Sequence, residues 1–246
     1  FSLWAFRELL LFARSPEFKH QLRWLVLIAI AVLFRFEGLF FLILAPFTLI
    51  FAAEKGTRWR ICARLAPLAF IAVGTLLPLL FFAQSSLAKE ESMFPDIGRY
   101  VRHFFSIPQD FSALAQKAAS NWLSFTSAED AAYAVIGGLT AILGVNLLRS
   151  LSWPYAGVMA WGASNKLLDR IQPRDRRLIN SHLIICLIYL SVFLLTNRFM
   201  LERYANIFTL YALLYIPFLL NTLWSKGKKG GGKFLVVLLL FGFCVD

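Results

Sequence analysis

Apolar runs recur along this chain and are separated by short basic or polar segments. A helix that crosses the hydrocarbon core of a membrane needs roughly 20 apolar residues. Four runs come close to or reach that length, at residues 61–83, 131–148, 178–196 and 205–224, and a fifth at 234–245 has only 12 residues. We therefore predict an all-α transmembrane helix bundle that forms a single domain over residues 1–246. Because the chain begins without methionine and stops inside a span, we expect a fragment of a longer protein.

The first apolar stretch, residues 24–53, differs from the others because charges interrupt it at Arg35-Phe36-Glu37-Gly38. One charged side chain at the centre of a membrane helix costs about 2.5 to 3.5 kcal/mol on insertion scales. The stretch is therefore either one long tilted span with two charges at its centre or a hairpin that turns at these residues. Gly38 permits such a turn.

The distribution of Lys and Arg favours the hairpin. Basic residues collect on the cytoplasmic side of membrane proteins, which assigns segments 54–64, 149–177 and 225–233 to that side. With a hairpin, 18 basic residues lie inside and 7 outside, whereas a single span gives 14 and 11. The two arms, of about 11 and 15 residues, are shorter than a full span, so the turn is expected at the external interface or in a cavity.

The remaining segments are predicted from their periodicity. The apolar piece 153–164 is flanked by basic residues and is typical of an interfacial helix. In the external segment 84–130, apolar residues repeat at helical spacing after Pro95 and again after Pro108, which predicts two amphipathic surface helices. Ser127 and Asp130 form a capping-box pattern at the start of the next span. Glycines at 230–232 indicate a flexible cytoplasmic connection.

Composition excludes a soluble globular protein. Hydrophobic residues make up 59% of the chain, its mean hydropathy is +0.67, and only 16% of its residues are charged. We predict a multi-pass integral protein of the bacterial inner membrane or an equivalent membrane. The net charge of +11 does not predict a nucleic-acid partner, because the basic residues form short clusters between apolar runs.

The three cysteines carry no metal-binding pattern. Cys62, Cys186 and Cys244 lie in or beside apolar runs, without a CxxC motif or a metal-type spacing to histidine. We interpret them as buried thiols. The sequence predicts no cofactor, and a divalent metal stays an open alternative.

Arginines on the predicted external side carry the candidate chemistry. The connection 197–204 contains Arg198 and the tripeptide Glu202-Arg203-Tyr204. If this connection and the turn that contains Arg35 and Glu37 lie on one side, they could share one external cavity. Because the planar guanidinium forms two parallel hydrogen bonds with phosphate, such a cavity favours a lipid phosphate.

These charges also have a structural interpretation. Arg35 could pair with Glu37, and the i, i+4 spacing of Arg198 and Glu202 suits a salt bridge on a helix surface. An arginine at the end of a span can also extend toward the head groups. A solvated polar face accounts for four further residues of the external segment: Asp96, Arg99, Arg102 and His103.

Two short motifs resemble those of GT-C type polytopic glycosyltransferases, including the mannosyltransferase-like members. Leu33-Phe34-Arg35-Phe36-Glu37-Gly38-Leu39 is similar to their Arg-Pro-Glu-Gly or Arg-Tyr-Glu-Gly hairpin, with Phe36 as a departure, and Glu202-Arg203-Tyr204 is similar to the Arg-Tyr before a late span. The resemblance implies a polyprenyl-phosphate-linked sugar donor, transfer on the external or lumenal face, and a glycan, lipid or protein acceptor among membrane lipids. It also implies that Arg203 and Tyr204 contact the carrier phosphate.

The resemblance leaves the catalytic residue unknown. In that group the catalytic carboxylate lies in the first external loop, so in this protein it would precede Phe1. A family member would use it as general base, with arginines stabilising the departing lipid phosphate. Asp96 and Glu37 are the acidic candidates within the chain, and Glu37 is better suited to orienting Arg35 or a substrate hydroxyl.

Two other classes of membrane protein are weighed against this one. An O-antigen polymerase or ligase also handles polyprenyl pyrophosphate with external arginines, but its external loop is longer and richer in Arg and His than segment 84–130. A transporter or flippase usually shows repeated halves with spans broken at corresponding positions. This chain has one broken hairpin and no internal repeat.

Overall fold

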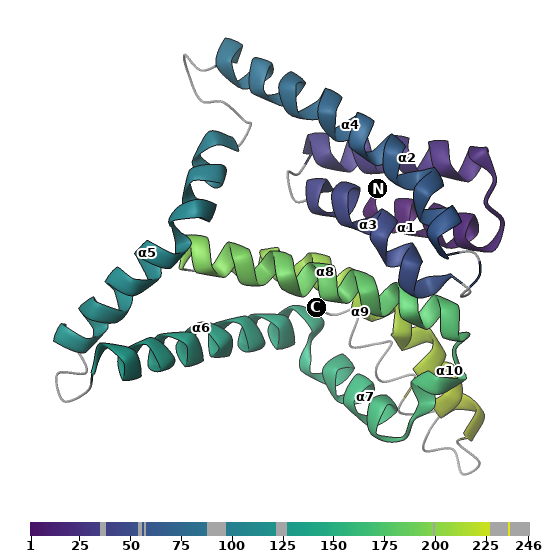
Figure 1. Cartoon of the computed structure of the whole chain (residues 1–246). Coiled ribbons are helices and arrows are strands. Elements are labelled where there is room, and N and C mark those ends of the chain that lie inside the picture. The colour runs from purple at the N-terminus through teal and green to yellow at the C-terminus, as the bar shows by residue number, and fades with distance from the viewer. Residues whose placement is uncertain are drawn as a thin grey trace.

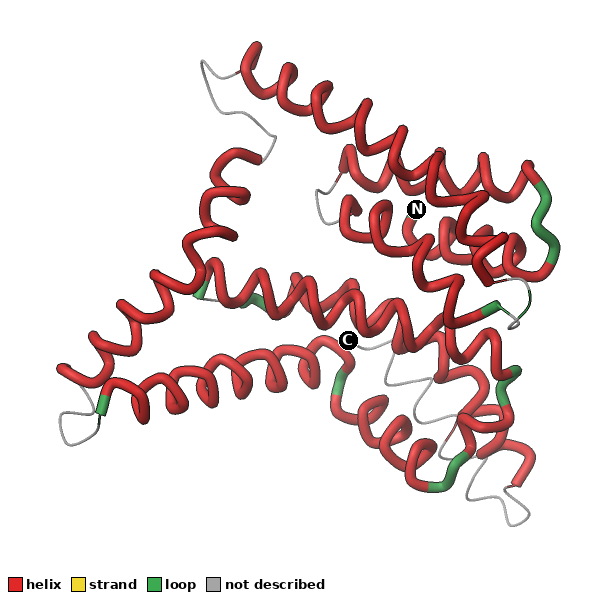
Figure 2. The backbone as a smooth tube through the Cα atoms, in the orientation of Figure 1, coloured by secondary structure: helices red, strands yellow, loops and turns green. Residues whose placement is uncertain are grey.

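A computed structural model describes residues 1–34, 38–53, 56, 58–87, 97–121, 127–198, 200–226 and 236. Within these ranges every regular element is a helix, which confirms the predicted all-α class (Figure 2). In chain order the elements are α1 (Ser2–Arg14), α2 (Phe18–Phe34), α3 (Gly38–Ala52), α4 (Arg58–Leu87), α5 (Ile97–Asn121), α6 (Ala128–Leu151), α7 (Trp153–Ser164), the 3-10 turn η1 (Leu167–Arg170), α8 (Pro173–Asn197), α9 (Glu202–Ala212), the 3-10 turn η2 (Leu213–Tyr215) and α10 (Ile216–Lys226).

Four segments of the described chain are long and apolar enough to cross a membrane. They are Arg58–Pro78 in α4, Glu129–Leu151 in α6, Pro173–Asn197 in α8, and Glu202–Ser225, which α9, η2 and α10 form together. These segments coincide with the four predicted spans, as expected for an integral membrane protein. The last span contains a 3-10 turn just before Pro217, because proline lacks the N–H that would continue the α-helical ladder.

The stretch that begins at Trp24 forms two helices, as the hairpin interpretation predicts. α2 and α3 pack against each other, whereas a single span would have made one continuous helix (Figure 1). α2 begins at Phe18, earlier than expected, because the basic residues before Trp24 continue the same helix. Gly38 is needed for close packing: a Cβ atom there would lie 2.8 Å from the backbone N of Val32.

α1 was not predicted from the sequence. It packs along α2 and buries Phe6, Leu9 and Phe12. It also buries Glu8, whose carboxylate lies 2.7 Å from His20 Nδ1 in α2. The signal was present as an apolar repeat at helical spacing, but this segment had been interpreted only for its basic residues.

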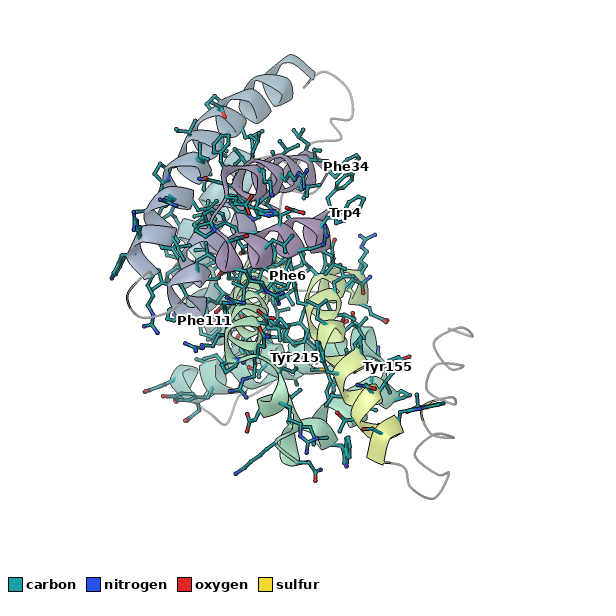
Figure 3. All side chains as sticks on the ribbon, turned by 90° about the vertical axis from the view of Figure 1, so that its right-hand side faces the viewer. Trp4, Phe6, Phe34, Phe111, Tyr155 and Tyr215 are labelled. Carbon is teal, nitrogen blue, oxygen red and sulfur yellow. The ribbon has the colours of Figure 1, made fainter. Side chains whose placement is uncertain are left out.

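An aromatic cluster joins α1, α3, α8 and α9 at the centre of the helix group. His182, buried in α8, lies between the rings of Phe6 at 4.7 Å and Tyr211 at 5.2 Å, measured between ring centroids. Phe41 of α3 stacks on Tyr211 at 5.4 Å. In Figure 3, Phe6 points into the helix group, while Trp4 and Phe34 project at its margin. Because these contacts come from four helices, the cluster sets how the ends of those helices lie relative to one another.

Segment 84–130, which we predicted to be external, contains one long helix, α5, between the end of α4 and the start of α6, so the prediction of two separate surface helices is wrong. α5 continues through Pro108 and bends along its course (Figure 1). A proline removes one backbone hydrogen bond, and a helix can bend around it without ending. The second half of α5 packs on α6 and buries Ala115 and Ala118.

The cap of α6 and the extent of α7 agree with the sequence. Ser127 Oγ accepts a hydrogen bond from the backbone N–H of Asp130 at 3.1 Å, which confirms the capping pattern. α7 has the predicted limits and packs against α10, where a Cβ on Gly162 would lie 2.4 Å from the Leu219 side chain. The interfacial location of α7 stays a prediction.

Candidate functional site

A pocket of about 180 Å³ lies where α1 and α3 begin and α2 ends. α8 and α9 close its other side. Its lining residues are Phe1, Ser2, Ala31, Phe34, Gly38, Tyr189, Tyr204 and Ile207. The pocket therefore contains residues on both sides of the Arg35-to-Glu37 turn together with Tyr204 of the later motif, two regions that are far apart in the sequence. We call it the hairpin pocket.

Four of the eight residues that line the hairpin pocket are aromatic. Phe1 and Phe34 stack with their ring centroids 5.8 Å apart. On the opposite side, Tyr204 contacts Phe193 at 4.5 Å, and Tyr189 contacts Phe40 at 5.1 Å. Its volume is below the roughly 300 to 1,000 Å³ of pockets for drug-sized ligands, so it suits one small group beside an apolar chain.

Arg203 places a positive charge beside this aromatic wall. Its Nη2 donates a hydrogen bond to Tyr204 Oη at 3.2 Å, and its Cζ lies 5.1 Å from the centroid of the Tyr204 ring. The side chain is exposed, and within the described ranges no carboxylate pairs with it. A guanidinium that contacts the ring of a pocket residue and has no carboxylate partner among the described residues is suited to an amphipathic anion.

Arg198 has a different surrounding. It caps α8 with a left-handed backbone (φ 59°), and its Nη2 donates to the carbonyl oxygen of Asp110 in α5 at 3.3 Å. Its guanidinium also lies 3.9 Å from Asp110 Oδ1. The sequence-based salt bridge with Glu202 is wrong, because α8 ends at Asn197 and Glu202 begins a new helix.

Several predicted site residues fall outside the described part of the chain. Arg35, Phe36 and Glu37 are among them, although their neighbours Phe34 and Gly38 line the pocket. Asp96 also lies outside it. The side chains of Arg99, Arg102 and His103 in α5 are likewise not described. A shared cavity for Arg35, Glu37 and Arg203 therefore stays a prediction, with both neighbours of the turn at the pocket.

Sequence reasoning missed the aromatic residues of the hairpin pocket. Phe1, Phe34 and Tyr189 line it, and none was nominated. Tyr189 offered a signal, because a tyrosine within an apolar span carries a polar hydroxyl that needs a polar neighbour. Phe1 and Phe34 offered none, since phenylalanine is common throughout this chain.

Other polar groups of the bundle have structural surroundings. Glu8 is buried against His20, so it is not a free acid. Cys62 and Cys186 are buried, as predicted, whereas Cys244 lies outside the described residues. Among the residues that the structure describes, no three His, Cys, Asp or Glu side chains gather closely enough to hold a metal ion.

Comparison of the chain with protein-family models, with curated proteins and with solved structures gives no match. The features of this chain that bear on function are therefore the two short motifs and the pocket that residues beside both of them line.

Proposed function

We propose that this protein is a multi-pass membrane glycosyltransferase that transfers a sugar from a polyprenyl-phosphate-linked donor to an acceptor on the external face. One observation carries the proposal: Phe34 and Gly38, which flank the Arg-x-Glu motif in the sequence, line one pocket with Tyr204, and the guanidinium of Arg203 contacts Tyr204. These are the two regions whose sequences resemble GT-C enzymes. The membrane is the bacterial inner membrane or its equivalent.

The pocket supplies two of the features that such a donor requires. Aromatic side chains such as Phe1, Phe34 and Tyr204 offer an apolar surface for the first units of the polyprenyl chain. Arg203 offers a fork of N–H donors for the phosphate, which becomes the leaving group when the sugar is transferred. In this proposal Arg35 contacts the same phosphate, and Glu37 orients Arg35 or a sugar hydroxyl.

The proposal assigns no catalytic base within the chain. The acceptor hydroxyl or amine must lose a proton as it attacks the anomeric carbon, and a carboxylate is the residue expected to take that proton. Glu8 is paired with His20 and does not line the pocket.

Two matched arginine variants of the full-length protein test the proposal. Arg203→Gln should lower kcat/KM with a radiolabelled polyprenyl-phosphate sugar by about 100-fold or more, the usual effect of removing one donor that stabilises developing charge. Arg198→Gln loses the same charge on the same connection but contacts Asp110, so its turnover should stay within about threefold.

The result would contradict the proposal if both variants kept wild-type turnover, or if both stayed folded and lost turnover equally. Size-exclusion profiles and helical circular dichroism separate loss of folding from loss of chemistry. A wild-type protein that moved the polyprenyl-phosphate sugar across vesicles without transferring it would support the flippase alternative instead.

A further inference from the structure

A second pocket, of about 340 Å³, lies at the other end of the same helices, where α1 and α3 end and α4 and α8 begin. Four arginines from three separate basic segments line it: Arg14, Arg60, Arg64 and Arg174. In the sequence, these basic segments indicate only which side of the membrane is cytoplasmic. The fold brings them to one place, which we call the basic pocket.

Part of this charge is neutralised within the protein. Arg14 Nη2 donates to Asp175 Oδ2 at 2.5 Å. Arg174 Nε lies 3.5 Å from Asp175 Oδ1, and both atoms are buried without a hydrogen-bond partner in the described structure. One carboxylate thus faces two arginines, and it meets the hydrogen-bonding needs of only one of them.

Arg60 and Arg64 have no such partner among the residues that the structure describes. They lie four residues apart on α4, so their side chains occupy the same helix face. Both are exposed, and in the described ranges neither guanidinium has a hydrogen bond or an ion pair. Gln21 of α2 donates its amide to the Arg64 carbonyl oxygen and holds this turn of α4 in place. Two like charges beside each other are costly unless an anion lies between them.

The rest of the lining is apolar. Ala13, Ala53 and Ile61 are buried side chains at the pocket. An anion that fills this pocket therefore meets guanidinium groups and an apolar surface together. A phosphate attached to a glycerol and acyl chains has both characters, whereas free phosphate would leave the apolar part uncovered.

We propose that the basic pocket binds the phosphate of an anionic phospholipid, with Arg60 and Arg64 as its principal ligands. Basic pockets between membrane helices on the cytoplasmic side bind acidic head groups, each basic residue adding to the affinity. The phosphate chemistry is common to a lipid and to soluble phosphate, and the apolar lining favours the lipid. This inference does not depend on the glycosyltransferase proposal, because it concerns the opposite end of the helices.

The test is native mass spectrometry of the full chain released from a non-ionic detergent and titrated with phosphatidylglycerol. Arg60→Gln/Arg64→Gln should weaken binding of the first lipid by about 10- to 30-fold, because two charges near the head group are lost. Wild-type affinity should also fall as salt rises. Lys166→Gln/Arg170→Gln removes the same charge from exposed residues outside the pocket and should leave the first lipid bound.

Soluble probes distinguish the two sources of phosphate. Diacylglycerol of the same acyl length, which lacks phosphate, should not bind at this site, and inorganic phosphate at millimolar concentration should not displace the lipid. Equal lipid binding by both double variants would overturn the site, and displacement by inorganic phosphate would overturn the lipid assignment. Because Arg60 and Arg64 are exposed and unpaired among the described residues, their replacement should not unfold the protein, which circular dichroism would verify.

Discussion

The two ends of the helix group formed by α1, α2, α3 and α8 carry different chemistry. The hairpin pocket has aromatic walls and one exposed arginine beside Tyr204. The basic pocket has four arginines, an apolar lining and one acid that satisfies part of the charge. The same helices form both pockets. The difference in their chemistry therefore arises from which residues lie at each end of these helices.

This contrast between the two pockets follows from the surroundings of the arginines at each end. Arginines that mark the cytoplasmic side can gather because each can reach acidic head groups or water. At the hairpin end, Arg203 is the described arginine that contacts an aromatic ring of the pocket, and in our proposal it binds one anion. We therefore interpret the hairpin pocket as the site of chemistry and the basic pocket as an anchor for lipid.

The largest expected effect concerns which side of the membrane each end of the helix group faces. In a background without cysteine, Leu201→Cys, on the exposed α8–α9 connection, should react with a membrane-impermeant maleimide from outside intact cells. Lys166→Cys, exposed between α7 and α8, should react only after permeabilisation. Met200 is buried at 7% exposure, which makes Leu201 the better probe. Labelling of both cysteines from the same side would show that the two ends do not face opposite sides of the membrane.

The next effect concerns the closeness of α2 and α3 at the hairpin pocket. Gly38→Ala would bring a Cβ to 2.8 Å from Val32 N, so the two helices would have to shift, at a cost of about 1 to 3 kcal/mol in the free energy of unfolding.

Gly74→Ala is the matched control, because nothing lies within 4 Å of a Cβ there and alanine favours helix over glycine. Unfolding by SDS in mixed micelles, followed by circular dichroism, should show a loss for position 38 and no loss for position 74. Equal behaviour of the two variants would mean that close packing at Gly38 does not hold the hairpin.

A smaller effect is expected from the hydroxyl that holds Arg203. Tyr204→Phe keeps the aromatic wall but removes the acceptor 3.2 Å from Arg203 Nη2. A neutral-to-charged hydrogen bond of this kind supports a loss of about 3- to 10-fold in kcat/KM. Tyr133→Phe, at an exposed position of α6, should leave turnover unchanged. A wild-type rate for Tyr204→Phe would show that Arg203 needs no positioning by its neighbour.

The smallest effect is expected for the stability contribution of Arg198. Its ion pair with Asp110 is exposed and long, at 3.9 Å, so Arg198→Gln should cost only about 0.2 to 1 kcal/mol in the free energy of unfolding. The same measurement on Arg203→Gln should show a loss no larger than this, since no described carboxylate pairs with Arg203 and its contacts with Tyr204 are exposed. A larger loss for Arg203 would reverse the division between a structural arginine and a binding one.

Much of the fold could be predicted from periodicity. Local patterns predict these features. Apolar length predicts the four spans, and the count of basic residues predicts the hairpin. A serine before an acidic turn predicts the cap at Ser127, and flanking basic residues predict the limits of α7. α1 and the continuity of α5 were missed. α1 carries an apolar repeat at helical spacing, so this helix could have been predicted. α5 passes through Pro108 while it packs against α6, and spacing along the chain does not show that contact.

In the candidate site, too, some residues could be predicted from the sequence and others could not. Arg203 and Tyr204 could be nominated because charged and polar residues stand out in an apolar chain. Phe1, Phe34 and Tyr189 could not, because an aromatic residue that lines a pocket looks like one that packs in a core or faces lipid. The partner of Arg198 was assigned wrongly, since spacing along the chain cannot show that a helix ends between two residues.

By itself the sequence determined that this is a helical chain with membrane spans and a charged hairpin turn, because apolar length and charge distribution act locally along the chain. Tertiary structure alone decided that Phe34 and Gly38 meet Tyr204 in one pocket, and that Arg14, Arg60 and Arg174 meet in another. The physical reason is that such meetings depend on how helices pack. That packing is set by the shapes of many side chains at once, including the aromatic cluster around His182.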